Sequence, residues 1–198
     1  MNILKPQKIQ TNNLNRVDDI LKEIEKEEIT INNVSIEKSI ISNTEITKSN
    51  LEKNTFIDVQ FKNCNFSNTS FENCTFIRCE FDNCKITGCS FIESRLFNVS
   101  FTEVNLNYAN FSLSSIEKVV FNNTGIRNSN FQENKLKDVL FEQADLTQAN
   151  FFRTSLNGID FSESEIEGIV LGIEDIKGAT INQFQALDLL YLLGVKIK

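Results

Sequence analysis

The sequence predicts an all-β solenoid with square coils, because one apolar position recurs at a fixed period along most of the chain. Every fifth residue from Ile31 to Ile181 is Ile, Leu or Phe, over 31 consecutive positions. The residue two places before each of them is mostly small or slim, as at Cys74, Cys79 and Ala109. A period of five fits neither the helix nor the flat strand. It fits a repeat in which each five-residue unit points one large and one small side chain inward.

Four such units would close a coil every 20 residues, so residues 20 apart should stack as neighbours in a parallel ladder. The Phe residues follow this register as two opposite columns, with aliphatic walls between them, and stacked rings would add to the burial energy. The columns are Phe61, Phe81, Phe101, Phe121, Phe141 and Phe161, and Phe71, Phe91, Phe111, Phe131 and Phe151. At a spacing of about 4.8 Å per coil, residues 31–181 would form a rod about 36 Å long.

Composition favours one domain that is not an enzyme. The 198 residues are 40% hydrophobic, which suffices for a core, and no 18-residue apolar run predicts a membrane span. The first residues lack the apolar stretch of a secretory signal, so we expect a cytoplasmic location. The chain has no His and no phosphate-binding loop, which removes the usual nucleophile, base and metal arrangements. We therefore expect no catalytic residues, no cofactor and no metal.

All five cysteines occupy the small inward position, where packing explains them. Cys74, Cys79, Cys84 and Cys89 recur every five residues, so they would lie on four successive faces and could not converge on a metal. Cys64 and Cys84 are 20 apart, which permits a disulfide by distance, although both thiols would point into the core. Asn54 and Asn134 occupy the same inward position and would need buried hydrogen-bond partners.

The two ends of the chain lack the period and are expected to cap the solenoid. In the N-terminal capping segment, residues 1–30, a helix from about Asn13 to Glu28 would place one apolar stripe on the first coil. A partner-binding helix or coiled-coil seam is the alternative for this segment. The stripe consists of Leu14, Val17, Leu21 and Ile24.

The C-terminal segment, residues 182–198, predicts a cap that also dimerises. Thr180 and Gln183 have the spacing of a capping box, and Gly194 can end the helix in the left-handed conformation. Apolar residues cover nearly the whole circumference between them, which is more than one face packed on a coil can bury. A second copy of the chain in a twofold dimer would cover the remaining apolar surface of the helix. The expected interface residues are Phe184, Leu187, Leu190, Tyr191 and Leu193.

The repeat resembles the pentapeptide-repeat family, whose units read as a small residue, Asp or Asn, Leu or Phe, and two polar residues. Ala109-Asn110-Phe111 and Ala149-Asn150-Phe151 match it well. The resemblance implies a right-handed quadrilateral parallel β-helix over residues 31–181, with short N- and C-terminal helices. The pattern of Gln183, Leu187, Tyr191 and Gly194 is similar to the dimerisation segment of the quinolone-resistance (Qnr-like) branch, with Tyr191 where Leu is expected.

That branch implies a non-enzymatic homodimer that mimics duplex DNA, binds a type II topoisomerase such as DNA gyrase, and confers quinolone resistance. The coils carry 20 Asp or Glu and 13 Lys or Arg, so direct binding of nucleic acid is not expected. Members that protect gyrase strongly often carry projecting loops, whereas an unbroken period predicts a rod without them. The expected acidic partner-binding patch consists of Asp145, Asp160, Glu163, Glu165 and Glu167.

A general protein-protein interaction scaffold with no topoisomerase role is the alternative function. Ile57, Ile77 and Phe97 face outward by register and are 20 apart, so they would form an apolar stripe on one face. Such stripes mark contacts with partners, although β-branched and aromatic residues are also tolerated on a β surface.

Overall fold

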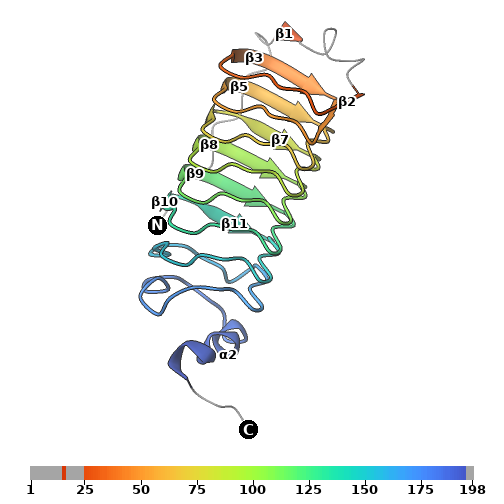
Figure 1. Cartoon of the computed structure of the whole chain (residues 1–198). Helices are drawn as coiled ribbons and strands as arrows, with labels where there is room; N and C mark the ends of the chain where they lie inside the picture. The colour runs from red at the N-terminus through yellow and green to blue at the C-terminus, as the bar shows by residue number, and fades with distance from the viewer. Residues whose placement is uncertain (1–14, 17–24, 195–198) are drawn as a thin grey trace.

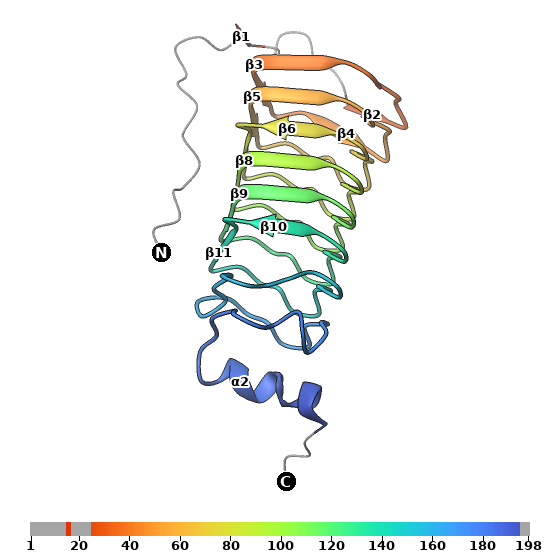
Figure 2. The same cartoon turned by 90° about the vertical axis from the view of Figure 1, so that its left-hand side faces the viewer.

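The computed structural model describes residues 15–16 and 25–194. It shows a stack of coils running from β3 at one end to a short C-terminal helix, α2, at the other (Figure 1). The view turned by 90° shows the same coils edge-on, with α2 beyond the last of them (Figure 2). The fold is the expected parallel β-solenoid.

The strands pair in parallel with a register of 20 residues from β2 onward, so Phe61 lies beside Phe81 and Phe81 beside Phe101. Isolated bridges continue this register along the rest of the rod, ending at Asp160 and Thr180. The strands are β1 Asn15–Arg16, β2 Glu25–Glu27, β3 Ser35–Ser42, β4 Glu45–Thr47, β5 Thr55–Lys62, β6 Thr75–Ile77, β7 Glu80–Asp82, β8 Arg95–Thr102, β9 Ser115–Asn122, β10 Lys135–Lys137 and β11 Leu140–Glu142.

The four faces of the rod differ in backbone structure. We number them by their central residues: face 1 contains Phe56 and Phe76, face 2 Phe61 and Phe81, face 3 Phe66 and Ile86, and face 4 Phe71 and Phe91, each repeating every 20 residues. Strands β3 and β5–β11 form faces 1 and 2. Faces 3 and 4 are mostly β-turns, closed by bonds such as Cys89 N–H to the Ile86 carbonyl at 3.3 Å. Beyond β11, faces 1 and 2 become turns as well, as Ile159 N–H to the Leu156 carbonyl shows.

A residue in the left-handed conformation stands at nearly every corner, two places after the central residue. Asn63 has a φ of 53° and Asp58 a φ of 56°, and most other units repeat this geometry. Asn tolerates this conformation and is frequent at these corners. Bulky side chains are unusual there, yet Tyr108 and Leu113 have φ values of 61° and 62°.

The core consists of the expected Phe columns. Phe121 is fully buried, with its ring stacked 5.1 Å from Phe101 and 5.0 Å from Phe141. Rings on the opposite faces 2 and 4 meet edge to face in the core, as Phe111 and Phe121 do at 6.2 Å. Phe121 therefore has aromatic neighbours both along the rod and across it, in the two arrangements that aromatic pairs favour.

The five cysteines are free and buried, as expected from their inward positions. Burial raises the pKa of Cys74 to about 11 and those of Cys79 and Cys89 to about 12. Hydrogen bonding with Cys64, followed by burial, raises the pKa of Cys84. The thiols thus stay protonated at neutral pH, which is typical of unreactive structural cysteines.

The small inward residues at the corner between faces 4 and 1 form a column of polar side chains. Each accepts the backbone N–H of the residue 20 places earlier: Cys74 N–H bonds to Ser94 Oγ at 3.0 Å, and Ser94 N–H bonds to Ser114 Oγ at 3.0 Å. These N–H groups lie at the junction between turn and strand and need an acceptor in the core. The column consists of Asn54, Cys74, Ser94, Ser114, Asn134 and Thr154.

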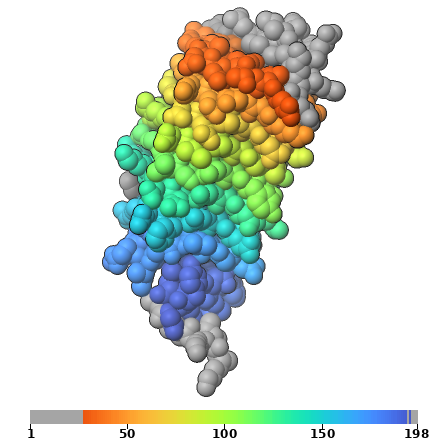
Figure 3. All heavy atoms as spheres, in the orientation of Figure 1, coloured from red at the N-terminus to blue at the C-terminus, as the bar shows by residue number. Residues whose placement is uncertain are grey.

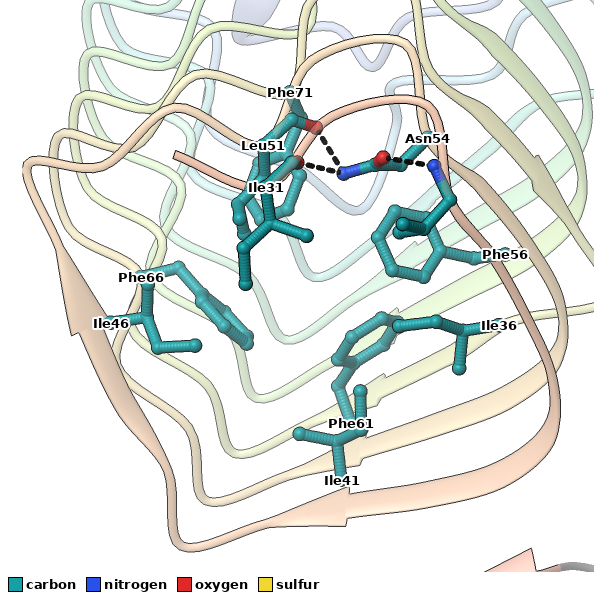
Figure 4. Close-up of a pocket in the computed structure, with 11 residues that line it drawn as sticks. Ile31, Ile36, Ile41, Ile46, Leu51, Asn54, Phe56, Phe61, Phe66 and Phe71 are labelled. Atoms are coloured by element: carbon teal, nitrogen blue, oxygen red, sulfur yellow. Dashed lines mark hydrogen bonds between the residues drawn. The ribbon is translucent and has the colours of Figure 1, made fainter. Parts of the chain in front are cut away.

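Asn54 has a full set of partners in this column. Its amide nitrogen donates to the carbonyls of Ile31 and Leu51 at 2.7 and 3.0 Å, and its oxygen accepts Val34 N–H at 2.9 Å (Figure 4). Asn134 accepts Ser114 N–H at 2.8 Å, but its buried amide nitrogen has no hydrogen-bond partner within the described part of the chain.

An apolar pocket of about 60 Å³ lies beside Asn54, between the first full coil and the next. Figure 4 shows Ile36, Ile41 and Ile46 facing it from one coil, with Phe rings from the coil that follows. Isoleucine fills less volume than phenylalanine, so the core is less tightly filled at this end of the rod.

The helix expected from about Asn13 to Glu28 is wrong for the residues that the structure describes in this range. Asn15–Arg16 form β1, which pairs with β3, and Glu25–Glu27 form β2, which pairs with β4 in the 20-residue register. Strand pairing supplies partners to the backbone groups of the first coil, which a helix laid across it would leave unpaired. The ladder thus begins before the expected boundary at residue 31. The expected stripe of Leu14, Val17, Leu21 and Ile24 lies outside the described residues.

Candidate functional site

The C-terminal cap begins with reciprocal hydrogen bonds between Asn182 and Gln185. Asn182 Oδ1 accepts the N–H groups of Phe184 and Gln185 at 2.9 and 3.0 Å, and Gln185 Oε1 accepts Asn182 N–H at 2.8 Å. This is the geometry of a capping box, two residues beyond the expected pair of Thr180 and Gln183. That expected pair was wrong because the last coil continues through Thr180, which still bridges Asp160.

Side chains of the cap pair with the carbonyl groups of the last coil. Gln185 is buried, and its Nε2 donates to the carbonyls of Phe161 and Ser164 at 2.7 and 2.6 Å. Tyr191 donates its hydroxyl proton to the Ile169 carbonyl at 2.6 Å. Since the ladder ends here, the Ser164 and Ile169 carbonyls have no following coil to bond, and the cap supplies their donors. The Phe161 carbonyl also accepts Ser164 N–H of its own turn at 2.9 Å.

The cap is shorter and more broken than the single helix predicted by the sequence. It consists of α2, Gln185–Asp188, and a 3₁₀ turn, η2, Leu190–Leu193, which ends at Gly194 with a left-handed φ of 65°. Leu189 is buried against the core. The opposite side carries Phe184, Leu187 and Tyr191, whose exposed fractions are 72%, 58% and 50%.

Three of the five expected interface residues therefore present apolar surface to solvent at the end of the rod. Leu190 is half-buried, and the side chain of Leu193 is outside the described part. The space-filling view shows the described residues of the cap, in dark blue, directly below the last coils (Figure 3).

The expected acidic patch lies on the last two coils, next to this tip. Asp145 and Glu165 are bridged neighbours on face 3, and Asp160 belongs to face 2. Asp160, Glu163, Glu165 and Glu167 are exposed, whereas Asp145 is half-buried. No ion pair involves Glu163, Glu165 or Glu167 within residues 28–194. The three carboxylates are thus available to a partner.

Asp145 differs from the others because the chain already neutralises it. It forms an ion pair with Arg127 and also accepts the Thr147 hydroxyl at 2.7 Å. Burial alone would raise the pKa of Asp145, but the hydrogen bonds from Thr147 and Arg127 outweigh burial and lower the pKa. Asp145 is therefore ionised but satisfied, and the remaining four residues carry the uncompensated charge.

The expected apolar stripe of Ile57, Ile77 and Phe97 is in register on β5, β6 and β8, and all three side chains are half-buried. Cations lie over the Phe97 ring: Lys118 Nζ is 5.4 Å and Arg95 Cζ 5.8 Å from its centroid. The long side chains of Arg95 and Lys118 thus cover part of this stripe, and the rest of it is exposed to solvent.

A more exposed apolar surface, not predicted from the sequence, lies on face 4 near the C-terminus. Phe152, Val170 and Ile173 have exposed fractions of 42%, 49% and 49%, and we call these three residues the terminal apolar cluster. The signal for it was present in the register. Val170 stands in a column that otherwise contains Asn, Ser and Thr from Thr30 to Asn150.

The described residues contain no group of three or more His, Cys, Asp or Glu side chains arranged to hold a metal ion. Within the same part of the chain, no helix has the length and apolar character needed to cross a membrane. The exposed groups near the C-terminal end of the rod are carboxylates on faces 2 and 3 and apolar side chains on face 4 and the cap.

Comparison with known proteins agrees with the repeat. Residues 54–131 match the family model described as "Pentapeptide repeat region", and residues 129–168 match the one described as "Pentapeptide repeats (8 copies)". No curated protein matches the chain.

Several solved structures are similar to the chain at low identity. A trypsin-treated variant of QnrB1, a plasmid-mediated fluoroquinolone resistance protein, is 20% identical with a TM-score of 0.42, covering 87% of this chain and 99% of that one. Full-length QnrB1 is 21% identical with a TM-score of 0.39, covering 86% and 100%. A pentapeptide repeat protein from the Arabidopsis thaliana thylakoid lumen is 16% identical with a TM-score of 0.37, covering 67% and 72%.

Proposed function

This chain belongs to the pentapeptide-repeat family, and from that premise we propose that it is a non-enzymatic, cytoplasmic binding protein that engages a type II topoisomerase, DNA gyrase, as a DNA-mimicking homodimer. In this proposal the acidic end of the rod takes the place of duplex DNA on a basic surface of the enzyme. Quinolone resistance would follow if the bound rod displaces the DNA on which the drug acts.

The distribution of charge is the observation that carries the proposal. Residues 142–181 contain eight Asp or Glu and only two Lys or Arg, a net charge of −6 out of −7 for the whole chain. The coils above them are nearly neutral. A surface that binds DNA phosphates is rich in Lys and Arg, so it would attract this end of the rod rather than the rest.

The exposed cap supports the dimeric part of the proposal. Phe184, Leu187 and Tyr191 leave apolar area at the tip, directly beyond the acidic coils. A twofold contact between two tips would bury these side chains and place the two acidic segments on either side of the apolar caps, in the middle part of a double-length rod. The charge would then be greatest at the middle of the assembly.

The regular coils limit what part of the rod can make the contact. From residue 31 to residue 181 the described chain carries no projecting loop, because the 20-residue ladder continues through it. In this protein, therefore, the flat faces and the tip themselves would form the contact.

A gyrase supercoiling assay tests the proposal, with and without a fluoroquinolone. We expect the wild type to inhibit supercoiling or to protect it from the drug at stoichiometric excess. The matched variant Glu163→Gln, Glu165→Gln, Glu167→Gln keeps side-chain size and should lose most of the effect. If the wild type has no effect in either assay, the alternative of a general interaction scaffold is the better account.

A further inference from the structure

The terminal apolar cluster of Phe152, Val170 and Ile173 lies within the acidic segment of the rod. Asn150 and Val170 are bridged neighbours, and Phe151 N–H donates to the Val170 carbonyl at 2.7 Å, so the two coils of the cluster are directly stacked. Gly172 follows in the same face and adds no side chain between Val170 and Ile173. The three side chains therefore lie exposed on the same face of two directly stacked coils.

A local departure from the repeat shapes this patch. Asp175 Oδ2 accepts the N–H groups of both Gly172 and Arg153, at 2.8 and 2.9 Å. Elsewhere on this face, the N–H at the position of Arg153 bonds to the next coil's backbone, as Lys53 N–H does to the Glu72 carbonyl at 2.9 Å. The carboxylate of Asp175 thus replaces a ladder bond and fixes the turn that exposes Ile173.

Carboxylates border the patch along the chain on both sides. Exposed Glu167 precedes Val170 by three residues and has no ion pair in the described part of the chain, whereas exposed Glu174, which directly follows Ile173, forms an exposed ion pair with Lys177. A second copy of the chain would bring the same negative charge to the same place, so like-charge repulsion disfavours it as the occupant. Charge complementarity instead favours a partner surface that is basic and has apolar parts.

Lysine and arginine side chains have both properties, because an apolar stem carries the charged group. The chain itself contains such an arrangement: the Arg153 guanidinium lies 5.3 Å from the Phe152 ring centroid and pairs with Glu133 Oε1 at 3.2 Å. The ring contacts the cation and the carboxylate neutralises it. A partner's basic side chains can pack their apolar stems on Val170 and Ile173 and pair their charged groups with the adjacent carboxylates.

We infer that the terminal apolar cluster binds the stems of Lys and Arg side chains on the partner protein while the neighbouring carboxylates bind their charged groups. This rests on the proposed function and names the surface by which the rod would hold gyrase. It differs from mimicry of phosphate charge alone, because part of the affinity would come from apolar contact and would persist at high salt.

The test uses a variant that restores the polar residues found elsewhere in the same columns: Phe152→Gln, Val170→Asn and Ile173→Asn. Gln132, Asn150 and Asn33 occupy the equivalent positions, so the coil should fold as before, and net charge is unchanged. Tyr108→Asn is the control, because it removes an exposed ring from a coil outside the cluster. Circular dichroism and thermal melting check the fold of each variant.

Affinity for gyrase is measured over a series of salt concentrations. We expect the triple variant to bind at least about tenfold more weakly at every salt concentration, with the same salt slope as the wild type, since three apolar contacts are lost. Tyr108→Asn should bind as the wild type does. A triple variant with wild-type affinity at high salt would overturn the inference and leave the proposed function standing.

A second measurement keeps the two proposals separate if the wild type does not bind gyrase. Decamers of lysine and of 2,4-diaminobutyric acid carry the same charge on longer and shorter stems at mildly acidic pH. We expect the wild type to bind the lysine decamer several-fold more tightly and the triple variant to bind both equally. Absence of a stem preference in the wild type contradicts the inference, whatever gyrase does.

Discussion

Tyr191 donates its hydroxyl proton to the carbonyl of Ile169 at 2.6 Å, which ties the C-terminal cap to the last coil of the solenoid. Burial of the hydroxyl raises the pKa of Tyr191, so the proton needed for this bond is held at neutral pH. A leucine, which the family resemblance leads one to expect here, could pack at this position but could not donate. The tyrosine therefore gives this cap a polar anchor in addition to Gln185.

Tyr191→Phe should lower the free energy of unfolding by about 1 kcal/mol, because it leaves the Ile169 carbonyl without its donor while retaining most of the ring's packing. Hydrogen exchange of the amides near residues 165–171 should quicken more than that of the central coils. Urea denaturation and exchange measured by mass spectrometry check both effects. Unchanged exchange at the last coil would show that the hydroxyl does not hold the cap.

Asn54→Ser and Asn134→Ser should have opposite effects, although both replace an asparagine in the same inward column. Asn54 donates to two carbonyls, so its shorter replacement should lower stability by about 1 to 2 kcal/mol. Asn134 has an unpaired buried amide nitrogen, and serine, as at Ser94 and Ser114, would bond fully. We expect this change to be neutral or stabilising.

Thermal and urea unfolding of the two serine variants, measured side by side, check this pair. Both substitutions create the same residue in the same column, so each serves as the control for the other. Equal losses of stability in the two variants would contradict the claim that Asn54 differs from Asn134 in the hydrogen bonds of its amide nitrogen.

Phe121→Ala should lower the free energy of unfolding by about 3 to 5 kcal/mol, because it removes a fully buried ring from the middle of a stacked column. Tyr108→Ala, which truncates an exposed ring, should cost far less. Urea denaturation of the two variants gives the comparison. A loss of under about 1 kcal/mol for Phe121→Ala would be incompatible with a ring inside the core.

The tip of the rod should be a dimer contact. Sedimentation equilibrium of the wild type at micromolar concentration is expected to give twice the monomer mass. Phe184→Ser combined with Leu187→Ser should give a folded monomer, since both side chains are exposed in the single chain and removing them costs little internal packing. A wild type that is already monomeric would contradict the dimer.

The sequence predicted the architecture well because the fold repeats one short-range rule many times. The 20-residue register places Phe61 beside Phe81, and the same rule places all five cysteines in the core. The same register stacks Asn63 and Asn83, and Asn83 Nδ2 donates to Asn63 Oδ1 at 2.8 Å. Each of these follows from spacing alone.

Features set by single contacts could not be predicted from spacing. Asn110 and Asn130 are stacked by the same register, but each side chain accepts the backbone N–H two residues further on, at 3.0 Å, and does not bond its neighbour as Asn83 does. The turn fixed by Asp175 does not interrupt the five-residue period, so the period could not predict it. At the N-terminus, the apolar spacing predicted a helix that would include residues 25–27. These residues instead form strand β2, which pairs with β4.

For the candidate site, the sequence placed the acidic residues and the apolar cap correctly near one end of the rod, because both follow from chain order. It did not show that Arg127 neutralises Asp145, since those residues are 18 apart and meet only through the coil geometry. The terminal apolar cluster was overlooked because its residues belong to three different outward columns and form a surface only when two coils are stacked.

Competition between the protein and duplex DNA for gyrase tests the central claim most directly. A fluorescent duplex bound to gyrase is titrated with the wild type and with the Glu163→Gln, Glu165→Gln, Glu167→Gln variant while its anisotropy is followed. We expect the wild type to displace the duplex and the neutralised variant to do so far less effectively. A duplex that stays fully bound at a large excess of the wild-type protein would contradict DNA mimicry by the acidic end of the rod.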